Sequence, residues 1–557
     1  MRPNFALVHA KRDLPSCYTE GKPVVPHAGS GGRPRMGPDA GVSPAHVQTP
    51  LILALDVGTS SVRAVLYDGR ARPVEGTMAQ QAHQMYETVD GGVETGANQL
   101  LARVEACIDG ALEQAGPLAE RIAAVASDTF WHNVLGVSAG AAAVTPVYTW
   151  ADTRAAAAAE ALKADLDQAE MHARTGAVLH PSYLPAKLRW LQDAGPRAPL
   201  SRSTRSRVRR WLSFADWLGL RFFGECATSV SMASGSGLLN QLTCDWDAAV
   251  LKAIPLDRTQ LPDLRDEPYR GLRPAYARRW PHLAQIPWFP AWGDGATSNI
   301  GAGCVTSSQV AMMVGTSGAM RVVRASRDLV IPPYLFCYRV DSRRAVIGGA
   351  LSNGGNLIDW LRATLQVPEN HEAMERAVAD LEPDGHGLTI LPFLAGERSP
   401  GWKPRARAVI AGLGLHNTPS EIVRAGYETV ANRFALIHAL LKETNPRIGP
   451  VVASGAALLH SPTWLQIMAD ALGAAVTASA VPEASSRGAA LLALEALGAI
   501  RSVSAIPAPE GTVYRPRAAN TTRYRAAAAR QHALYQKLVA SEDRPDVPGW
   551  DEQASRA

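Results

Sequence analysis

Cysteine is scarce in this chain of 557 residues, which holds only six. No two cysteines form a C-x-x-C pair, and none has a histidine beside it at the spacing of a metal site. This pattern excludes a disulfide framework and a zinc ribbon, so we expect reduced core residues of a cytoplasmic protein. The six are Cys17, Cys107, Cys226, Cys244, Cys304 and Cys337.

Long hydrophobic runs are also missing. No stretch of about 18 apolar residues is free of charge, so we predict no membrane-spanning helix and expect no membrane partner. The Ala-rich stretch 488–500 comes nearest, but Glu495 interrupts it and we interpret it as a buried helix. The N-terminus has basic residues without an apolar core, which argues against a secretory signal.

The excess of positive charge is small. The net charge is +5, of which residues 1–50, with six basic and three acidic residues, carry +3. The other 507 residues carry only +2, which argues against a nucleic-acid partner. One basic cluster, residues 201–210, holds five arginines; we interpret it as a solvated helix face, with a polyanion site as the alternative.

Residues 1–48 are rich in Pro, Gly, Arg and Ser and show neither strand nor helix periodicity. We predict a disordered leader there, with Met36 as a later candidate for the translation start. The folded body is expected to begin at Pro50.

The same four residues, Val-Gly-Thr-Ser, occur at 57–60 and again at 314–317. Each copy stands between two apolar runs and precedes an arginine, which predicts a strand, a small-residue loop and a second strand in both places. We infer an internal duplication that makes two similar α/β lobes. The predicted boundaries are 49–304 for the first lobe, 305–545 for the second and 546–557 for a frayed tail.

The first copy has the features of a phosphate-binding loop. Small residues after a strand let backbone N–H groups and the hydroxyls of Thr59, Ser60 and Ser61 approach a phosphate. Asp56 at the strand end could hold Mg²⁺ through water, whereas the second copy has Met313 at that position. A plain hairpin turn is the alternative. Neither a G-x-x-x-x-G-K-[ST] nor a G-x-G-x-x-G motif occurs, which excludes P-loop and simple Rossmann folds.

Asp294 stands between two glycines, Gly293 and Gly295, after an aromatic stretch. An aspartate in this setting is most often a turn residue. In a functional interpretation the glycines give a substrate hydroxyl access to the carboxylate. Asp294 would then accept the proton as that hydroxyl attacks a γ-phosphate.

Aromatic residues stand beside hydrogen-bonding groups after two further predicted strands, at Trp131-His132 and at Trp150 with Asp152 and Arg154. Aromatic faces pack on sugar C–H groups, while Asp, His and Arg bind hydroxyls or a carboxylate. The alternative is a core tryptophan in both places, a structural histidine, and a helix cap by the aspartate.

The stretch 397–402 is dense in polar and turn residues and predicts a loop of the second lobe. We expect its Glu397 and Arg398 to pair with each other.

Taken together, these motifs resemble the FGGY carbohydrate kinases over about residues 50–500. The resemblance lies in the segments 56–63, 293–296, 314–317 and 408–428. Within the family the chain is most similar to gluconate kinases, through the segments 130–137, 149–154, 396–402 and 483–488.

The resemblance implies an actin-like ATPase fold of the ribonuclease H-like type, with two lobes and a cleft that binds ATP and sugar. It implies that Asp294 is the general base and Asp56 the Mg²⁺-side carboxylate. The implied ATP-binding residues are Thr59, Ser60 and Ser61 in the first loop, Gly315 and Thr316 in the second, and Gly355, Gly455 and Ala456 on the nucleotide side. Ala456 departs from the family, which often has Gly-Gly there.

The function implied is phosphoryl transfer from Mg·ATP to a terminal hydroxyl of a sugar acid, with D-gluconate to 6-phosphogluconate favoured. The substrate-binding residues are then Trp131, His132, Trp150, Asp152 and Arg154 with Asp294, and we expect Arg154 and His132 to hold the carboxylate. A kinase for another ketose or polyol, similar to xylulokinases, is one alternative. A catalytically silent actin-like nucleotide-binding module is another. The sequence leaves a monomer and a homodimer both open.

Overall fold

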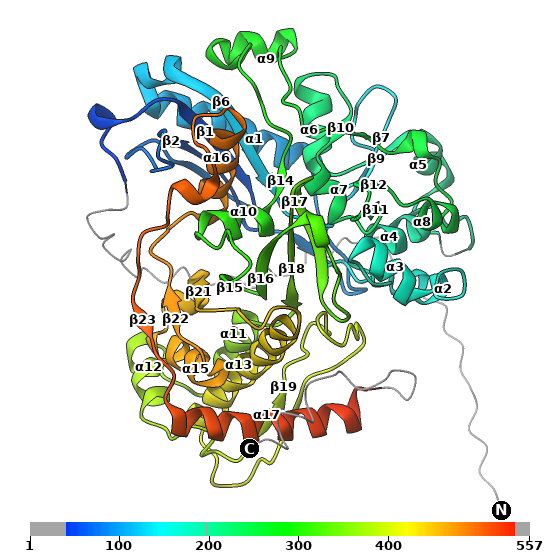
Figure 1. The fold of residues 1–557 in the computed structure, drawn as a ribbon. Coiled ribbons are helices and arrows are strands. Elements are labelled where there is room, and N and C mark those ends of the chain that lie inside the picture. The colour runs from blue at the N-terminus through cyan, green and yellow to red at the C-terminus, as the bar shows by residue number, and fades with distance from the viewer. Residues whose placement is uncertain (1–40, 197, 541–557) are drawn as a thin grey trace, which may run out of the picture. The chain divides into compact units, whose positions relative to one another are not determined.

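The computed structural model describes residues 41–196 and 198–540 (Figure 1), which all lie in one unit spanning residues 39–557. Residues 1–40 of the leader predicted at 1–48, and the tail predicted at 546–557, lie outside the described residues. Residues 41–48, expected in the leader, are packed instead: Val42 pairs with Val74 in a parallel bridge, and both are buried. The Pro- and Gly-rich composition of this segment therefore does not prevent Val42 from packing against the first lobe.

The first half of the chain contributes most of the short elements. In chain order these are η1 (Pro44–His46), β1 (Leu51–Val57), β2 (Ser61–Tyr67), β3 (Ala79–Ala82), β4 (Tyr86–Glu87), β5 (Val93–Thr95), α1 (Ala97–Ala115), η2 (Gly116–Arg121), β6 (Ile122–Thr129), β7 (Leu135–Val137), β8 (Val147–Tyr148), α2 (Ala156–Leu162), α3 (Gln168–Thr175), α4 (Leu184–Leu191), α5 (Arg202–Arg207), β9 (Arg210–Leu212), α6 (Phe214–Phe222), β10 (Ala227–Thr228), α7 (Val230–Ser234), β11 (Leu239–Asn240), β12 (Asp245–Trp246), α8 (Ala248–Ala253), η3 (Arg258–Gln260), β13 (Asp263–Leu264), α9 (Pro274–Arg279), η4 (Pro281–Leu283), β14 (Trp292–Gly293) and α10 (Asp294–Gly301).

The second half continues with longer strands and helices. These are β15 (Val310–Val314), β16 (Gly318–Ala325), η5 (Ser326–Asp328), β17 (Phe336–Asp341), β18 (Arg344–Leu351), α11 (Gly355–Thr364), α12 (His371–Ala379), β19 (Thr389–Leu391), β20 (Val409–Ala411), α13 (Pro419–Thr444), β21 (Val451–Ser454), α14 (Ala456–Leu459), α15 (Pro462–Leu472), β22 (Val476–Ala478), α16 (Ala484–Ala496), η6 (Val503–Ala505), β23 (Val513–Tyr514) and α17 (Ala518–Leu538).

A five-stranded sheet in the order β14-β6-β1-β2-β3 forms the centre of the first lobe. β1 and β2 make the predicted antiparallel hairpin, and β6 lies parallel to β1 on its other side. Alternate residues of β1 enter two cores: Leu53 and Leu55 pack with residues of α1, whereas Ile52 and Ala54 pack with residues of α16. Burial on both faces explains why this strand is a continuous apolar run.

The seven-stranded sheet of the second lobe, β17-β18-β16-β15-β21-β22-β23, repeats this arrangement. β15 and β16 form an antiparallel hairpin, β21 lies parallel to β15, and β18 pairs antiparallel with β16. The neighbour order β6-β1-β2-β3 of the first sheet therefore recurs as β21-β15-β16-β18. This confirms the predicted duplication and the two-lobe α/β fold.

The helices α10 and α16 pack against each other at very close range, and α16 also packs on β1 and β6 of the first sheet. A Cβ on Gly301 would lie 1.7 Å from the carbonyl oxygen of Ala484, and one on Gly488 would lie 1.9 Å from that of Thr297. Glycine is therefore required at both contacts. The stretch predicted as a buried helix thus joins the second half of the chain to the first sheet (Figure 1).

Three further predictions concern the arginine cluster, the cysteines and the absence of a membrane-spanning helix. Within the arginine cluster, Arg202–Arg207 forms the short helix α5, which has no buried residue, whereas Arg210 belongs to β9. Five cysteines are free, of which Cys107, Cys304 and Cys337 are buried, while Cys17 lies outside the described residues. In the part of the chain that the structure describes, no helix combines the length and hydropathy needed to cross a membrane. A cytoplasmic location stays a prediction.

Candidate active site

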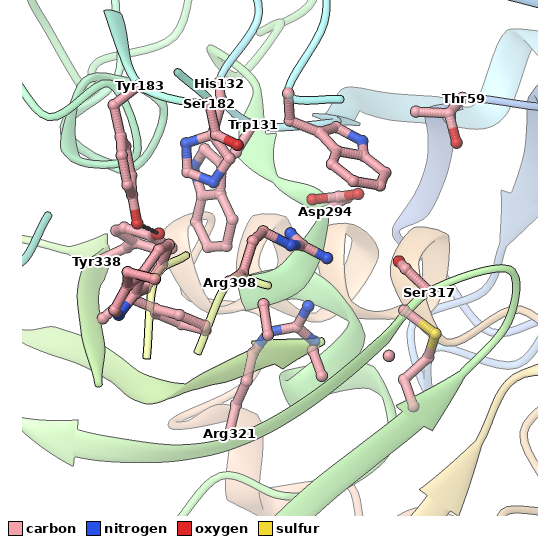
Figure 2. Close-up of a pocket in the computed structure, with 17 residues that line it drawn as sticks. Thr59, Trp131, His132, Ser182, Tyr183, Asp294, Ser317, Arg321, Tyr338 and Arg398 are labelled. Carbon is pink, nitrogen blue, oxygen red and sulfur yellow. Dashed lines mark hydrogen bonds between the residues drawn. The ribbon is translucent and has the colours of Figure 1, made fainter. Parts of the chain in front are cut away.

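A pocket between the two sheets gathers five of the predicted site residues (Figure 2). These are Thr59, Trp131, His132, Trp150 and Asp294. The second half of the chain contributes Ser317, Arg321, Tyr338, Arg398 and Trp402 to the same lining. Tyr183 and Tyr338, one from each half, join their hydroxyls across it at 2.6 Å.

Each of the two predicted phosphate loops is closed by a backbone hydrogen bond from its glycine, but the first loop is one residue longer than the second. In the first, Gly58 N–H donates to the carbonyl of Ser61 at 3.0 Å, and in the second, Gly315 N–H donates to that of Ser317 at 2.9 Å. Thr59 and Ser317 both line the pocket. The loops therefore approach the pocket from opposite lobes, as two loops holding one polyphosphate require. Ser60 is exposed, whereas Ser61 is buried in β2.

The predicted nucleotide-side residues come together beside the second loop. Gly355 N–H donates to the carbonyl of Gly315 at 2.8 Å, and Asn356 N–H donates to that of Thr316 at 3.1 Å. Gly455 has a φ of 92°, and a Cβ there would lie 2.3 Å from the carbonyl oxygen of Val314. Ala456, at the start of α14, is exposed. Three loops of the second sheet thus lie together on the predicted nucleotide side.

Asp294 begins α10 and lies next to Arg321 (Figure 2). Desolvation raises the pKa of Asp294 to about 6, an effect that the guanidinium of Arg321 opposes. The carboxyl group is therefore largely ionised at neutral pH and able to accept a proton. Gly295 N–H donates to its Oδ1 at 2.7 Å.

The glycines on either side of Asp294 make room for two neighbouring side chains. A Cβ on Gly293 would lie 1.8 Å from the Trp131 ring, and a Cβ on Gly295 would lie 2.6 Å from that ring and 3.0 Å from the Arg321 guanidinium. The absence of side chains thus lets Trp131 and Arg321 pack against the backbone on either side of the carboxylate.

His132 has the wrong charge for the carboxylate-binding role expected of it. Its Nδ1 pairs with the carbonyl oxygen of Gly235, so Nδ1 carries the hydrogen and donates it. Burial lowers the pKa of His132 to about 3. The ring is therefore neutral, and its Nε2 is an acceptor suited to a substrate hydroxyl.

Arg154 does not line the pocket. It pairs with Glu94 and with Asp152, and its guanidinium carbon lies 5.1 Å from the centroid of the Trp190 ring. Asp152 is buried and accepts a hydrogen bond from the backbone N–H of Arg154, so its contacts are structural. The expected carboxylate-binding role of Arg154 is therefore wrong, because two carboxylates already neutralise it.

Two other arginines supply positive charge to the pocket, and the sequence analysis did not assign them. Neither Arg321 nor Arg398 forms an ion pair with any described residue, and the Nε of each lacks a hydrogen-bond partner there. Burial lowers the pKa of both, that of Arg398 to about 10, so both stay charged at neutral pH.

The loop 397–402 explains why Arg398 is free to face the pocket. Glu397 pairs with Arg433 and accepts a hydrogen bond from the Tyr535 hydroxyl at 2.8 Å. The expected pairing of Glu397 with Arg398 is therefore wrong. Arg398 instead donates to the carbonyl of Leu351 at 2.8 Å and points into the pocket with Arg321 and Asp294 (Figure 2).

Asp56 and Asp128 complete the charged groups near the pocket. Asp56 is the last residue but one of β1, and its carboxylate pairs with Arg63 at 2.9 Å. Asp128 lies opposite it in the register of β1 and β6 and is fully buried. Asp128 was not among the predicted site residues, although a carboxylate near the end of an apolar strand indicates a possible site residue. Both carboxylates lie near the carboxyl ends of the neighbouring parallel strands β1 and β6, so their oxygens suit a divalent cation.

The two-lobed fold with facing phosphate loops and a carboxylate at the pocket defines an ATP-dependent phosphotransferase of the actin-like type. Residues 51–301 match the model of the N-terminal domain of the FGGY family of carbohydrate kinases, and residues 310–497 match that of its C-terminal domain. The chain belongs to this family.

Individual relatives carry several substrate names. The chain is 26% identical over 481 residues to a gluconokinase from Bacillus subtilis (strain 168), covering 84% of this chain and 91% of that protein. It is 27% identical over 463 residues to a glycerol kinase from Chloroflexus aggregans, covering 80% and 90%. Among solved structures, a gluconate kinase and a xylulose kinase from Lactobacillus acidophilus each superpose with a TM-score of 0.79 at 25% identity. Each superposition covers 88% of this chain, together with 98% of the gluconate kinase chain and 99% of the xylulose kinase chain.

Proposed function

We propose that this carbohydrate kinase transfers the γ-phosphate of Mg·ATP to the terminal hydroxyl of a sugar acid, with D-gluconate giving 6-phosphogluconate as the first candidate. The observation that carries the proposal is Arg398, a charged guanidinium in the sugar pocket with no carboxylate partner among the described residues. Leaving a buried cation unpaired is unfavourable, and a substrate carboxylate would pair with its planar fork through two hydrogen bonds.

Arg398 suits the carboxylate better than Arg321 does. Arg321 has the strongest influence of any charged group on the pKa of Asp294, which supports a role for Arg321 beside the reacting hydroxyl. Asp294 influences the pKa of Arg398 less than the hydroxyls of Tyr338 and Tyr183 do, which supports a role for Arg398 at the other end of the substrate. A linear sugar acid carries its terminal hydroxyl and its carboxylate at opposite ends.

The proposed reaction follows from the positions of the groups. Asp294 accepts the proton of the terminal hydroxyl as the oxygen attacks the γ-phosphorus, and Arg321 stabilises the charge that develops beside it. The loops at Thr59 and Ser317 orient the phosphates. Asp56 would hold Mg²⁺, which supplies charge neutralisation on the transferring phosphate when it is bound.

A neutral ketose or polyol is the second candidate substrate, because the relatives include xylulose and glycerol kinases. Such a substrate has no group that needs Arg398. A catalytically silent module is disfavoured by Asp294, since a protein that only binds nucleotide has no use for an ionised carboxylate in the sugar pocket.

The test measures ADP release with Mg·ATP against D-gluconate, other aldonates, D-xylulose, L-ribulose, glycerol and no sugar. We expect kcat/KM to be highest with an aldonate. Highest kcat/KM with a neutral sugar would contradict the sugar-acid proposal while leaving the role of Asp294 intact.

A further inference from the structure

Asp128 is a buried carboxylate without a partner. Its side chain is completely inaccessible to solvent, and neither Oδ1 nor Oδ2 has a hydrogen-bond partner among the described residues. An ionised carboxylate in such a position is strongly unfavourable unless a proton or a cation neutralises it. The mechanism above does not use this group.

The sheet places Asp128 between the two functional carboxylates. It faces Asp56 in the parallel register of β1 and β6, and Trp292 in that of β14 and β6. Asp56 and Asp128 are the last residues but one of their strands and Asp294 directly follows β14, so three neighbouring parallel strands each have an aspartate at or beside their carboxyl end.

The positive charge near these carboxylates is insufficient to balance them. Arg63 pairs with Asp56 at 2.9 Å, but it also lies 3.5 Å from Glu483. Arg321 faces Asp294 from the pocket. No ion pair of Asp128 occurs in residues 41–196 and 198–540. Its two free oxygens are therefore available as ligands, and hard oxygen donors of this kind bind Mg²⁺ or Mn²⁺.

We propose that Asp128 and Asp56 together bind a divalent cation directly, before nucleotide arrives, with Asp294 reaching it through water. The three carboxylates do not bring all their ligand oxygens within 4.8 Å of one another in the described structure. We assign the water-mediated contact to Asp294 because Asp56 and Asp128 are direct partners in the register of β1 and β6, whereas Asp294 lies beyond the end of β14. A single aspartate would hold the ion only together with the phosphates of ATP, whereas two can retain it alone. The inference relies on the proposed phosphotransfer only for the use of the ion, not for its binding.

The experiment titrates Mn²⁺ into the full-length protein without nucleotide or sugar and follows free Mn²⁺ by electron paramagnetic resonance. We expect one Mn²⁺ per chain, displaced by excess Mg²⁺. Asp128→Asn should weaken binding at least tenfold. The control Asp216→Asn changes another buried aspartate of the same lobe, one that caps α6, and should leave Mn²⁺ affinity unchanged.

Thermal unfolding provides the second measurement and shows whether each variant is folded. Mn²⁺ should raise the melting temperature of the wild type and of Asp216→Asn but not that of Asp128→Asn. Wild type that binds no Mn²⁺ up to millimolar concentrations, or Asp128→Asn that binds it normally, would overturn the inference. If the enzyme turns over a sugar acid but the free protein binds no Mn²⁺, only this inference is refuted. If the free protein binds Mn²⁺ but no sugar acid is turned over, only the proposed function is refuted.

Discussion

The guanidinium carbon of Arg398 lies 4.5 Å from the centroid of the Trp150 ring. The cation comes from a loop of the second lobe and the ring from the first, so the contact brings two segments together that are far apart in the sequence. Stacking on the ring orients a guanidinium that lacks a carboxylate partner and leaves its edge free for a ligand.

Replacing Arg398 should separate acid from neutral substrates. In Arg398→Gln we expect the KM for gluconate to rise about 10- to 100-fold, since a charge-assisted hydrogen bond contributes about 1.5–3 kcal/mol. Steady-state kinetics with gluconate and with a neutral sugar measures the difference. The matched control is Arg405→Gln, an exposed arginine of the same segment, which should leave KM unchanged. Equal effects of Arg398→Gln on both kinds of substrate would disprove the carboxylate role.

Replacing Asp294 should remove turnover while ATP binding remains. We expect Asp294→Asn to retain less than about a tenth of the wild-type kcat, which corresponds to a loss of at least ~1.4 kcal/mol of transition-state stabilisation. Calorimetric titration with ATP should give nearly the wild-type Kd. A variant that keeps more activity than this would show that another group accepts the proton.

Activity should depend on the protonation of Asp294, whose pKa is raised to about 6 by desolvation. Since only the ionised carboxylate accepts a proton, kcat/KM should fall as the pH decreases through about 6. A profile that is flat between about pH 5 and pH 8, with the protein folded throughout, would contradict the base assignment.

The same shift has a consequence for stability. The folded protein binds this proton more tightly than the unfolded chain, because the folded-state pKa is raised. The unfavourable contribution of the charge is therefore fully present above about pH 6 and is relieved as the pH falls toward about 4. Asp294→Asn should raise the melting temperature at pH 8 and should do so less at pH 5. An equal change at both pH values would show that the carboxylate charge is not the cause.

Arg154→Ala should affect stability rather than substrate binding. The substitution leaves Asp152 buried without its cation, so we expect a lower melting temperature. The KM values for gluconate and for neutral sugars should stay within about threefold of wild type, a change below ~0.7 kcal/mol. Calorimetry and kinetics on the same preparation test both parts. A large rise in the KM for gluconate alone would restore the direct role that the structure contradicts.

Much of the fold could be predicted because it is encoded in local patterns. The apolar run 51–56 and its small-residue loop define a hairpin by themselves, and their recurrence at 310–317 predicts the second lobe. The packing of Val42 on Val74 was missed, because one bridge across 32 residues leaves no periodic signal.

The candidate site was predictable only in part. Thr59 and Asp294 belong to short motifs whose geometry is local, and both line the pocket. Asp128 was missed because its significance depends on its neighbour in the sheet, Asp56, which lies 72 positions earlier. The expected charge on His132 was wrong, because burial and the Gly235 carbonyl together determine its protonation.

The sequence by itself determined the duplicated strand–loop–strand units, the two Val-Gly-Thr-Ser loops and the turn at Asp294, since each depends on residues adjacent in the chain. Only the tertiary structure decided which arginine faces the pocket. Glu94, 60 positions before Arg154, forms an ion pair with it, and Arg433 forms the ion pair with Glu397, so Arg398 has no carboxylate partner among the described residues. Whether an arginine can bind a ligand depends on which carboxylates lie within a few ångströms of it, and contacts between distant parts of the chain determine this.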